Sequence, residues 1–113
     1  MQASGKLDLV FHALSDPYRR AMVERLSRGS ASVKELAEPI DIALPSALKH
    51  LKVLEEGGLV ASTKSGRVRT YNMKPQALSS VGEWVRQREA TIGQAFDRLA
   101  AAMLEVPEED SGS

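Results

Sequence analysis

The sequence contains no cysteine, only two histidines and few aromatic residues. Without cysteine the chain has no disulfides, no thiol redox chemistry and no thiolate metal ligands. The histidines are His12 and His50, and neither has another histidine three or four residues away, as a helical metal site requires. We therefore expect no metal site and no cofactor.

Long apolar runs and a net charge are missing as well. No apolar stretch approaches the roughly 20 residues that span a bilayer, and the first residues lack the apolar centre of a signal peptide. We therefore expect a cytoplasmic protein without a membrane partner. The net charge is zero, but residues 41–75 carry six basic and three acidic side chains, whereas residues 76–113 carry three and seven. This uneven distribution favours a polyanionic partner for the middle of the chain.

Catalytic patterns are also absent. The sequence shows no Ser/His/Asp arrangement, no glycine-rich phosphate-binding loop and no cysteine nucleophile. Its acidic residues have ordinary explanations, since Asp16 precedes a proline as a helix cap does and the glutamates suit a solvated surface. We expect that the protein is not an enzyme.

The basic middle region is predicted to form a helix followed by a β-hairpin. Pro45 suits the first helical position, and Gly57–Gly58 suits the helix end. Two β-prone runs, 59–64 and 67–72, flank Ser65–Gly66 and predict a hairpin with these two residues at its tip. The apolar residues of the helix recur with a period of 3.6 and predict one buried face: Leu44, Ala47, Leu48, Leu51 and Leu54.

Both elements are basic and free of acids over their central stretches, 44–54 and 62–74. A basic helix beside a basic ribbon is typical of a surface that binds nucleic acid. The simpler alternative is the solvated polar face of an ordinary α+β domain. The residues predicted to contact DNA are Pro45, Ser46, Lys49, His50 and Lys52 on the helix, and Lys64, Arg67 and Arg69 on the hairpin. For His50, orienting the helix is as good an explanation as touching DNA.

Three further helices are predicted before this region. Apolar residues from Leu7 to Leu14 indicate a first helix of about two turns. Asp16-Pro17 begins a second helix, whose arginines (19, 20, 25 and 28) we interpret as a solvated or ion-paired face, a phosphate contact by an early one being the alternative. Ser32 and Glu35 form a capping box for a third helix, which Pro39 keeps short.

Four motifs in order resemble the ArsR/SmtB family of winged helix-turn-helix repressors over residues 7–104. They are Leu-Ser-Asp-Pro-Tyr-Arg-Arg at 14–20, Ser-Val-Lys-Glu-Leu-Ala at 32–37, Lys-His-Leu-Lys-Val-Leu-Glu-Glu-Gly-Gly-Leu-Val at 49–60, and Gly-Arg at 66–67. The resemblance implies a mainly α fold of about five helices plus a two-stranded wing, and a homodimer that binds double-stranded DNA. Metal-sensing relatives carry cysteines or Asp/His clusters that this chain lacks, so the effector stays unknown.

The basic helix that begins at Pro45 corresponds to the recognition helix of the family, the helix that enters the major groove of DNA. It departs from the family pattern at Leu48, where relatives commonly have a serine. Leu48 either completes the buried face, with Ala47 turned aside, or contacts the methyl group of a thymine. We favour the first interpretation.

The C-terminal region predicts a helix over about 77–104, which would be roughly 42 Å long. Such a length favours pairing with a second chain; the alternative is a helix folded back over its own core. Gly82 and Gly93 mark either a break in the helix or places of close packing. Residues 1–6 and 105–113 are predicted to be unstructured. The predicted dimer interface consists of Leu7, Val10, Phe11, Leu14, Val85, Ile92, Phe96, Leu99 and Met103.

Overall fold

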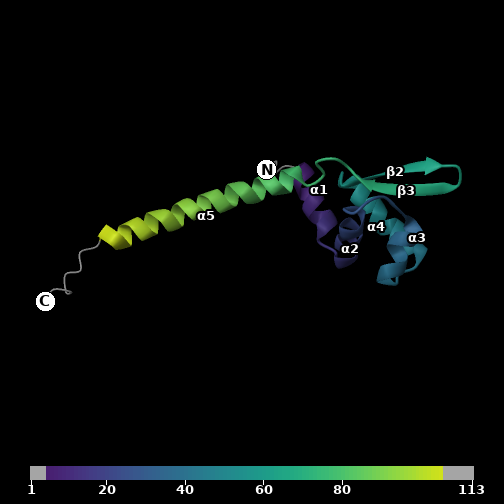
Figure 1. Ribbon diagram of the computed structural model, residues 1–113, viewed down its shortest axis with the longest axis horizontal. Helices are drawn as coiled ribbons and strands as arrows, with labels where there is room; N and C mark the ends of the chain where they lie inside the picture. The colour runs from purple at the N-terminus through teal and green to yellow at the C-terminus, as the bar shows by residue number, and fades with distance from the viewer. Residues whose placement is uncertain (1–4, 106–113) are drawn as a thin grey trace. The chain divides into compact units, whose positions relative to one another are not determined.

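The computed structural model describes residues 5–105, which fall into two compact units divided after Val81 (Figure 1). The predicted unstructured ends at 1–4 and 106–113 lie outside the described residues, although residues 5, 6 and 105 are helical. The elements are α1 (Gly5–Leu14), α2 (Pro17–Leu26), β1 (Ala31–Ser32), α3 (Val33–Ala37), the 3-10 helix η1 (Glu38–Ile40), α4 (Leu44–Glu56), β2 (Val60–Ser65), β3 (Val68–Met73) and α5 (Ser79–Glu105).

The start of α2 confirms the predicted cap. The carboxylate of Asp16 accepts hydrogen bonds from the backbone N–H groups of Tyr18 (2.7 Å) and Arg19 (3.1 Å), and Pro17 fills the first helical position. Partial burial opposes ionisation of Asp16, but these two hydrogen bonds outweigh it and hold the pKa of the carboxyl below its usual value. The cap therefore fixes where α2 begins.

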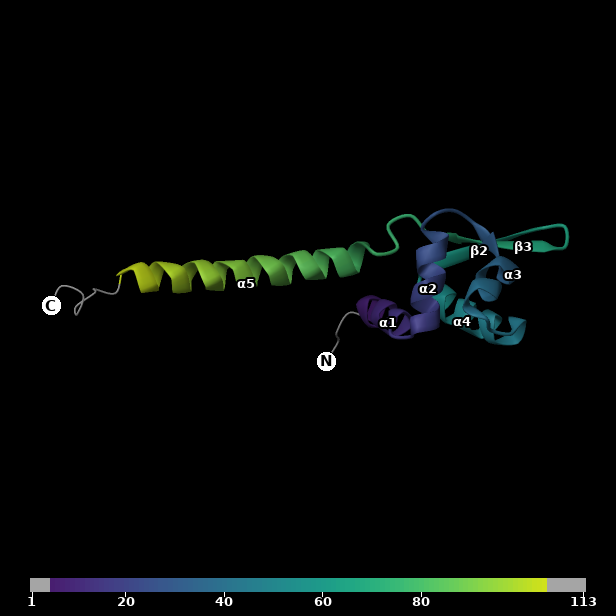
Figure 2. The same cartoon turned by 60° about the horizontal axis from the view of Figure 1, so that its bottom comes forward.

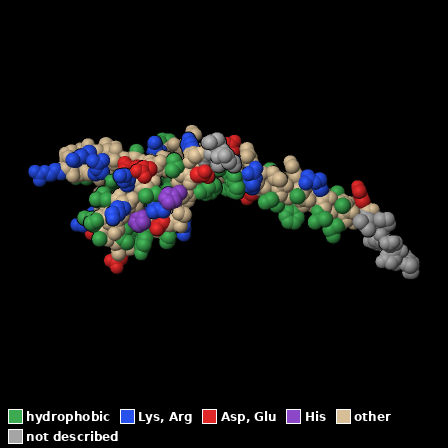
Figure 3. Space-filling model, turned by 180° about the vertical axis from the view of Figure 1, so that it is seen from behind, with side chains coloured by type: hydrophobic (Ala, Val, Ile, Leu, Met, Phe, Trp, Pro, Cys, Tyr) green, Lys and Arg blue, Asp and Glu red, His purple; other side chains and the backbone are tan. Residues whose placement is uncertain are grey.

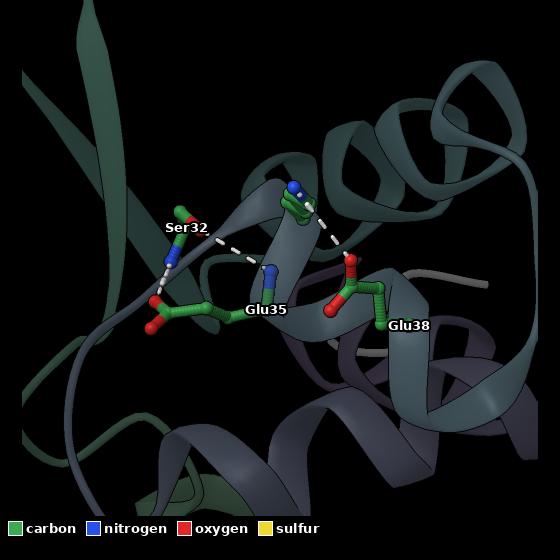
Figure 4. A network of polar contacts seen from close by, with 4 residues as sticks. Ser32, Glu35 and Glu38 are labelled. Atoms are coloured by element: carbon green, nitrogen blue, oxygen red, sulfur yellow. Dashed lines mark hydrogen bonds and ion pairs between the residues drawn. The ribbon is translucent and has the colours of Figure 1, made fainter.

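The capping box at the start of α3 is also confirmed (Figure 4). The Ser32 hydroxyl accepts from the Glu35 N–H at 3.2 Å, and the Ser32 N–H donates to the Glu35 carboxylate at 2.8 Å. An exposed ion pair joins Lys34 to Glu38 at 3.8 Å. Beyond Ala37 the chain narrows to a 3-10 turn containing Pro39, so α3 is short, as predicted.

The sheet has three strands in the order β1-β3-β2, one more than predicted. The extra strand, β1, pairs Ala31 with Tyr71 and Ser32 with Thr70. Two residues are too few to show an alternating pattern in the sequence, so only the tertiary structure reveals them. The tip of the β2–β3 hairpin projects beyond the helices in both views (Figures 1 and 2).

The hairpin turns one residue later than predicted. Ser65 pairs with Val68, so the two-residue tip is Gly66–Arg67 and not Ser65–Gly66. Gly66 has a φ of 64°, which the first position of a type II′ hairpin turn requires and glycine adopts without steric cost. The glycine therefore sets the register, and it places Arg67 in the turn and not in the strand.

The core of the first unit lies between α1, α2, α3, α4 and the sheet. At the end of α4, Gly58 takes a φ of 78°, which confirms the predicted glycine stop. A Cβ on Gly57 would lie 3.1 Å from the carbonyl oxygen of Leu9, so α1 packs closely against this end. The buried apolar residues are Val10, Ala13, Met22, Val23, Leu26, Ala31, Leu36, Ala37, Ala47, Leu51, Leu54, Leu59, Val60 and Tyr71.

The second unit consists of most of α5. The helix runs without interruption through Gly82 and Gly93, so a break at either glycine is wrong (Figure 2). A Cβ added at Gly93 would meet no other atom of the described residues within 4 Å. The guanidinium of Arg88 lies over the Trp84 ring, 5.3 Å from its centroid, one turn along the same helix.

Candidate nucleic-acid interface

The outer face of α4 is polar, basic and exposed over its first two turns. Pro45, Ser46, Lys49 and Lys52 are all exposed, whereas Ala47 on the opposite side is fully buried. The helix places these four residues on its outer side because Ala47, Leu51 and Leu54 anchor the other side in the core. Its acids, Glu55 and Glu56, come only in the last turn. The exposed part thus presents hydroxyl and ammonium groups without a competing carboxylate.

Leu48 does not lie on the buried face, so the favoured interpretation of this residue is wrong. Its side chain is 46 % exposed and that of Leu44 is 45 % exposed, whereas Ala47 takes the core position. A helix turns about 100° per residue, so the face that buries Ala47, Leu51 and Leu54 turns Leu48 to the side. The alternative interpretation, an apolar contact to DNA by Leu48, remains.

His50 lies on the flank of α4, half-buried, and is held by residues of α2. Its Nδ1 lies 3.1 Å from a terminal nitrogen of Arg19, and its ring centroid lies 5.7 Å from that of Tyr18. The orienting role that we considered for His50 therefore has a geometric basis.

Arg19 is not part of a solvated face, contrary to our prediction. It is only 9 % exposed, and its guanidinium donates to the carbonyl oxygens of Ala13 (2.7 Å) and His12 (3.2 Å) at the end of α1. The sequence contained a signal for this burial, because Arg19 precedes the core residues Met22 and Val23 by one helical turn. The charge of arginine favours an exposed position, but the helical period places Arg19 on the core side of α2.

Two more arginines of α2 bind backbone carbonyls. Arg20 donates to Leu14 at 2.8 Å, and Arg25 donates to Gly29 at 3.0 Å and to Ser30 at 3.4 Å. These carbonyls lie at helix ends and loops, where they have no partner within a helix. The arginines of α2 therefore join elements, and the structure offers no support for a phosphate contact by Arg19.

The basic residues of the wing lie at two places, in the turn of the hairpin and in its strands. Arg67 lies in the exposed tip, outside the strand that we predicted over residues 67–72. Arg69 is paired across the hairpin with Lys64, and its guanidinium donates to the Ser62 hydroxyl at 2.8 Å. The Ser62 hydroxyl in turn donates to the Glu55 carboxylate of α4 at 3.2 Å.

Tyr71 lies on the same hairpin face as Arg69 and Ser62 and is buried. Burial raises the pKa of its phenol above the usual value, and the negative charge of Glu55 adds to this effect. The hairpin is thus held at one level, by the burial of Tyr71 in the core and by the hydrogen bond from its cross-strand partner Ser62 to Glu55 of α4. Figure 3 shows Lys and Arg side chains gathered toward the free end of the hairpin.

The residues predicted for a dimer interface differ in exposure. Val10 is only 1 % exposed and belongs to the core of its own chain, so it is not open to a partner, whereas Leu14 is partly buried against that core. Leu7 is half-buried and Phe11 is exposed. In α5 the predicted residues are all exposed, and hydrophobic side chains follow one side of the helix (Figure 3); they are Val85, Ile92, Phe96, Leu99 and Met103.

Metal and membrane sites were searched within residues 5–105. No three His, Asp or Glu side chains in this range gather closely enough to hold a metal ion. None of the helices in the same range is both long and apolar enough to cross a membrane.

A capped supporting helix, a second helix with a basic outer face and an antiparallel wing define a winged helix-turn-helix domain. A family model described as a helix-turn-helix domain matches residues 14–63. The chain is 39 % identical to the HTH-type transcriptional regulator Rv2034 of Mycobacterium tuberculosis over 66 % of this chain and 69 % of that protein. It is 29 % identical to the transcriptional repressor SdpR of Bacillus subtilis over 67 % and 84 % of the two chains.

Among solved structures, the crystal structure of an ArsR-family transcriptional regulator matches with a TM-score of 0.74 and 42 % identity, covering 81 % of this chain and 95 % of that one. The chain belongs to the ArsR/SmtB family of DNA-binding transcriptional regulators. This membership confirms the resemblance seen in the sequence, and it places the protein in a class of regulators and not of enzymes.

Proposed function

We propose that the protein is a homodimeric repressor that binds an inverted-repeat operator in the cytoplasm, with α4 in the major groove and the wing on the flanking backbone. The observation that carries this proposal is the exposed, acid-free face of α4 beside the basic free end of the hairpin. Duplex DNA offers base edges to the first and phosphates to the second.

Within α4, Ser46 and Lys49 are proposed to read base edges, and Lys52 to contact phosphate. The first two lie in the opening turns, the part of a recognition helix that reaches bases. On the wing, Arg67 and Lys64 are proposed to contact phosphate or the adjacent minor groove. Arg69 is proposed to hold the wing against α4 through Ser62 and to add its positive charge to the same surface.

The dimer is proposed to form through α5, with Leu7 and Phe11 of α1 at its margin. Phe96 is 66 % exposed and Met103 67 %, and both lie on the apolar side of the helix. Apolar patches of this kind are rare on monomers and mark contact sites. A closed two-fold pair is the commonest solution, and it matches the symmetry of an inverted repeat.

Repression is the direction we propose because the chain resembles a protein named as a transcriptional repressor. A dimer bound across a promoter blocks access of the transcription machinery by occupying the DNA. A winged-helix module that binds only other proteins is not favoured, since the relatives are named as regulators.

The test is footprinting on the DNA upstream of the protein's own gene, followed by affinity measurements over a range of salt concentrations. We expect a two-fold-symmetric footprint and a steep negative slope of log affinity against log salt, at roughly 0.9 per phosphate neutralised. A flat salt dependence on every duplex would contradict the proposal and leave the protein-binding module.

A further inference from the structure

Arg19, a buried residue of α2, lies where three helices meet. Two of its nitrogens donate to the last turn of α1, at the carbonyls of Ala13 and His12, and a third lies 3.1 Å from His50 in α4. Its own backbone N–H donates to Asp16. One buried side chain thus joins the end of α1, the start of α2 and the middle of the recognition helix.

The chemistry of this contact fixes the state of the histidine. A guanidinium has only N–H donors and keeps its proton at any pH at which the protein is folded. Nδ1 of His50 must therefore accept, which requires a neutral ring with its proton on Nε2. Tyr18 packs against the same ring, with the two ring centroids 5.7 Å apart.

We propose that Arg19 is a positioning residue for DNA binding, which sets the orientation of α4 by donating to Nδ1 of His50. His50 is then the acceptor of this hydrogen bond, and Ser46 and Lys49 are the residues that contact the bases. This inference rests on the proposed function, because it assigns a consequence for DNA affinity to a contact within one chain. Through Arg19, the end of α1 is also connected to the recognition helix α4.

The central test compares two replacements of His50. In asparagine the side-chain oxygen takes the place of Nδ1, one bond beyond Cγ, so His50→Asn keeps an acceptor for Arg19. His50→Phe keeps the ring and removes the acceptor. Using a duplex that the wild-type protein selects from a random-sequence pool, we expect His50→Asn to bind within about threefold of wild type and His50→Phe to bind about tenfold or more weakly, the effect of one charge-assisted hydrogen bond.

Arg19→Lys tests the other partner, because lysine keeps the charge and loses the planar fork. We expect it to weaken binding about as much as His50→Phe, and the double variant to be no weaker than either single one. Arg20→Lys is the matched control, since Arg20 donates from the same helix to the Leu14 carbonyl. It should lower the melting temperature at most, with DNA affinity within about twofold of wild type.

Long-range ¹H–¹⁵N NMR of His50 supplies a readout that mere stability does not change. We expect an unprotonated Nδ1 and a protonated Nε2 in the wild type, and a mixture of tautomers in Arg19→Lys. If Arg19→Lys does not fold, the two His50 variants decide alone. Equal losses in His50→Asn and His50→Phe, or no loss in either, would overturn the positioning role. A wild-type protein that selects no duplex would instead contradict the proposed function.

Discussion

At the scale of single residues, exposure separates what α4 uses for packing from what it offers to a partner. Ala47 and Leu48 are neighbours in the sequence, yet Leu48 is 46 % exposed and Ala47 is fully buried. An exposed leucine next to Lys49 on a basic helix has a specific use in a major groove, where the thymine methyl group is the apolar feature.

We predict that Leu48 contacts a thymine methyl. Replacing operator thymines by uracil, one at a time, should weaken wild-type binding at one position of each half-site. The same replacement should have no effect on Leu48→Ala, because that variant has already lost the contact. Affinities measured by fluorescence anisotropy check this, with Leu44→Ala as a control on the same helix. Equal sensitivity of both proteins to every uracil would contradict the prediction.

Asp16 gives a second prediction at this scale, on the pH dependence of stability. Its pKa is lowered in the folded state, so its contribution is complete above the ordinary carboxylate pKa and is lost as the pH falls toward the folded value. At neutral pH, Asp16→Ala should lower the free energy of unfolding by about 1 kcal/mol, the usual effect of losing an N-cap.

Denaturant unfolding at neutral and acid pH measures this effect. Asp16→Asn is the matched variant, because asparagine also caps helices but does not titrate. It should keep most of the stability at neutral pH and show a weaker loss in acid than the wild type. A wild-type acid dependence that is unchanged in Asp16→Asn would show that the cap carboxylate does not contribute.

At the scale of elements, the wing combines a fixed base with a free end. Tyr71 is buried and Arg69 is bonded to Ser62, whereas Arg67 lies exposed in the turn that Gly66 forms. The two arginines are two residues apart in sequence but have different tasks in this geometry.

We predict that Arg67→Ala weakens binding to specific and random duplexes alike and lowers the salt slope by about one unit. This follows because a phosphate contact carries no sequence information and releases one counterion. Lys49→Ala is the comparison, since loss of a base contact should weaken operator binding more than binding to random DNA, by about 1–3 kcal/mol. An unchanged salt slope in Arg67→Ala would mean that the tip does not touch DNA.

At the scale of the whole molecule, the apolar side of α5 is the feature that a single chain leaves exposed. Ile92, Phe96, Leu99 and Met103 lie on this side, and each is more than half exposed. Burying one such side chain contributes roughly 1.5–3 kcal/mol, so several of them on each chain are enough to hold a dimer together.

We predict that Phe96→Asp converts a dimer into a monomer, because it places an unpaired charge in an apolar interface. Operator affinity should fall steeply although no DNA-facing residue changes, since a monomer contacts one half-site. Analytical ultracentrifugation at micromolar concentration checks the assembly, and Gln94→Asp, on the opposite side of the same helix, serves as the control for an added negative charge. A wild-type monomer that still binds its operator tightly would contradict the prediction.

The sequence alone determined the features that depend on near neighbours. The caps at Asp16 and Ser32, the short α3 before Pro39, the glycine stop of α4 and the existence of the hairpin all follow from residues within one or two turns of each other. The helical period also identified Leu51 and Leu54 as core, but it put Leu44 and Leu48 on the same face, and both are exposed. Family motifs at their proper spacing identified the class of protein.

The tertiary structure decided which flank of each helix is covered, because this depends on elements distant in the sequence. Arg19 is buried since α1 ends, and α4 passes, beside it; Ala47 takes the core position of α4 and leaves Leu48 exposed; and Val10 belongs to the core of its own chain. The register at Gly66 and the pairing of β1 are likewise set across strands. A period gives the direction of a side chain, but only packing determines what lies in that direction.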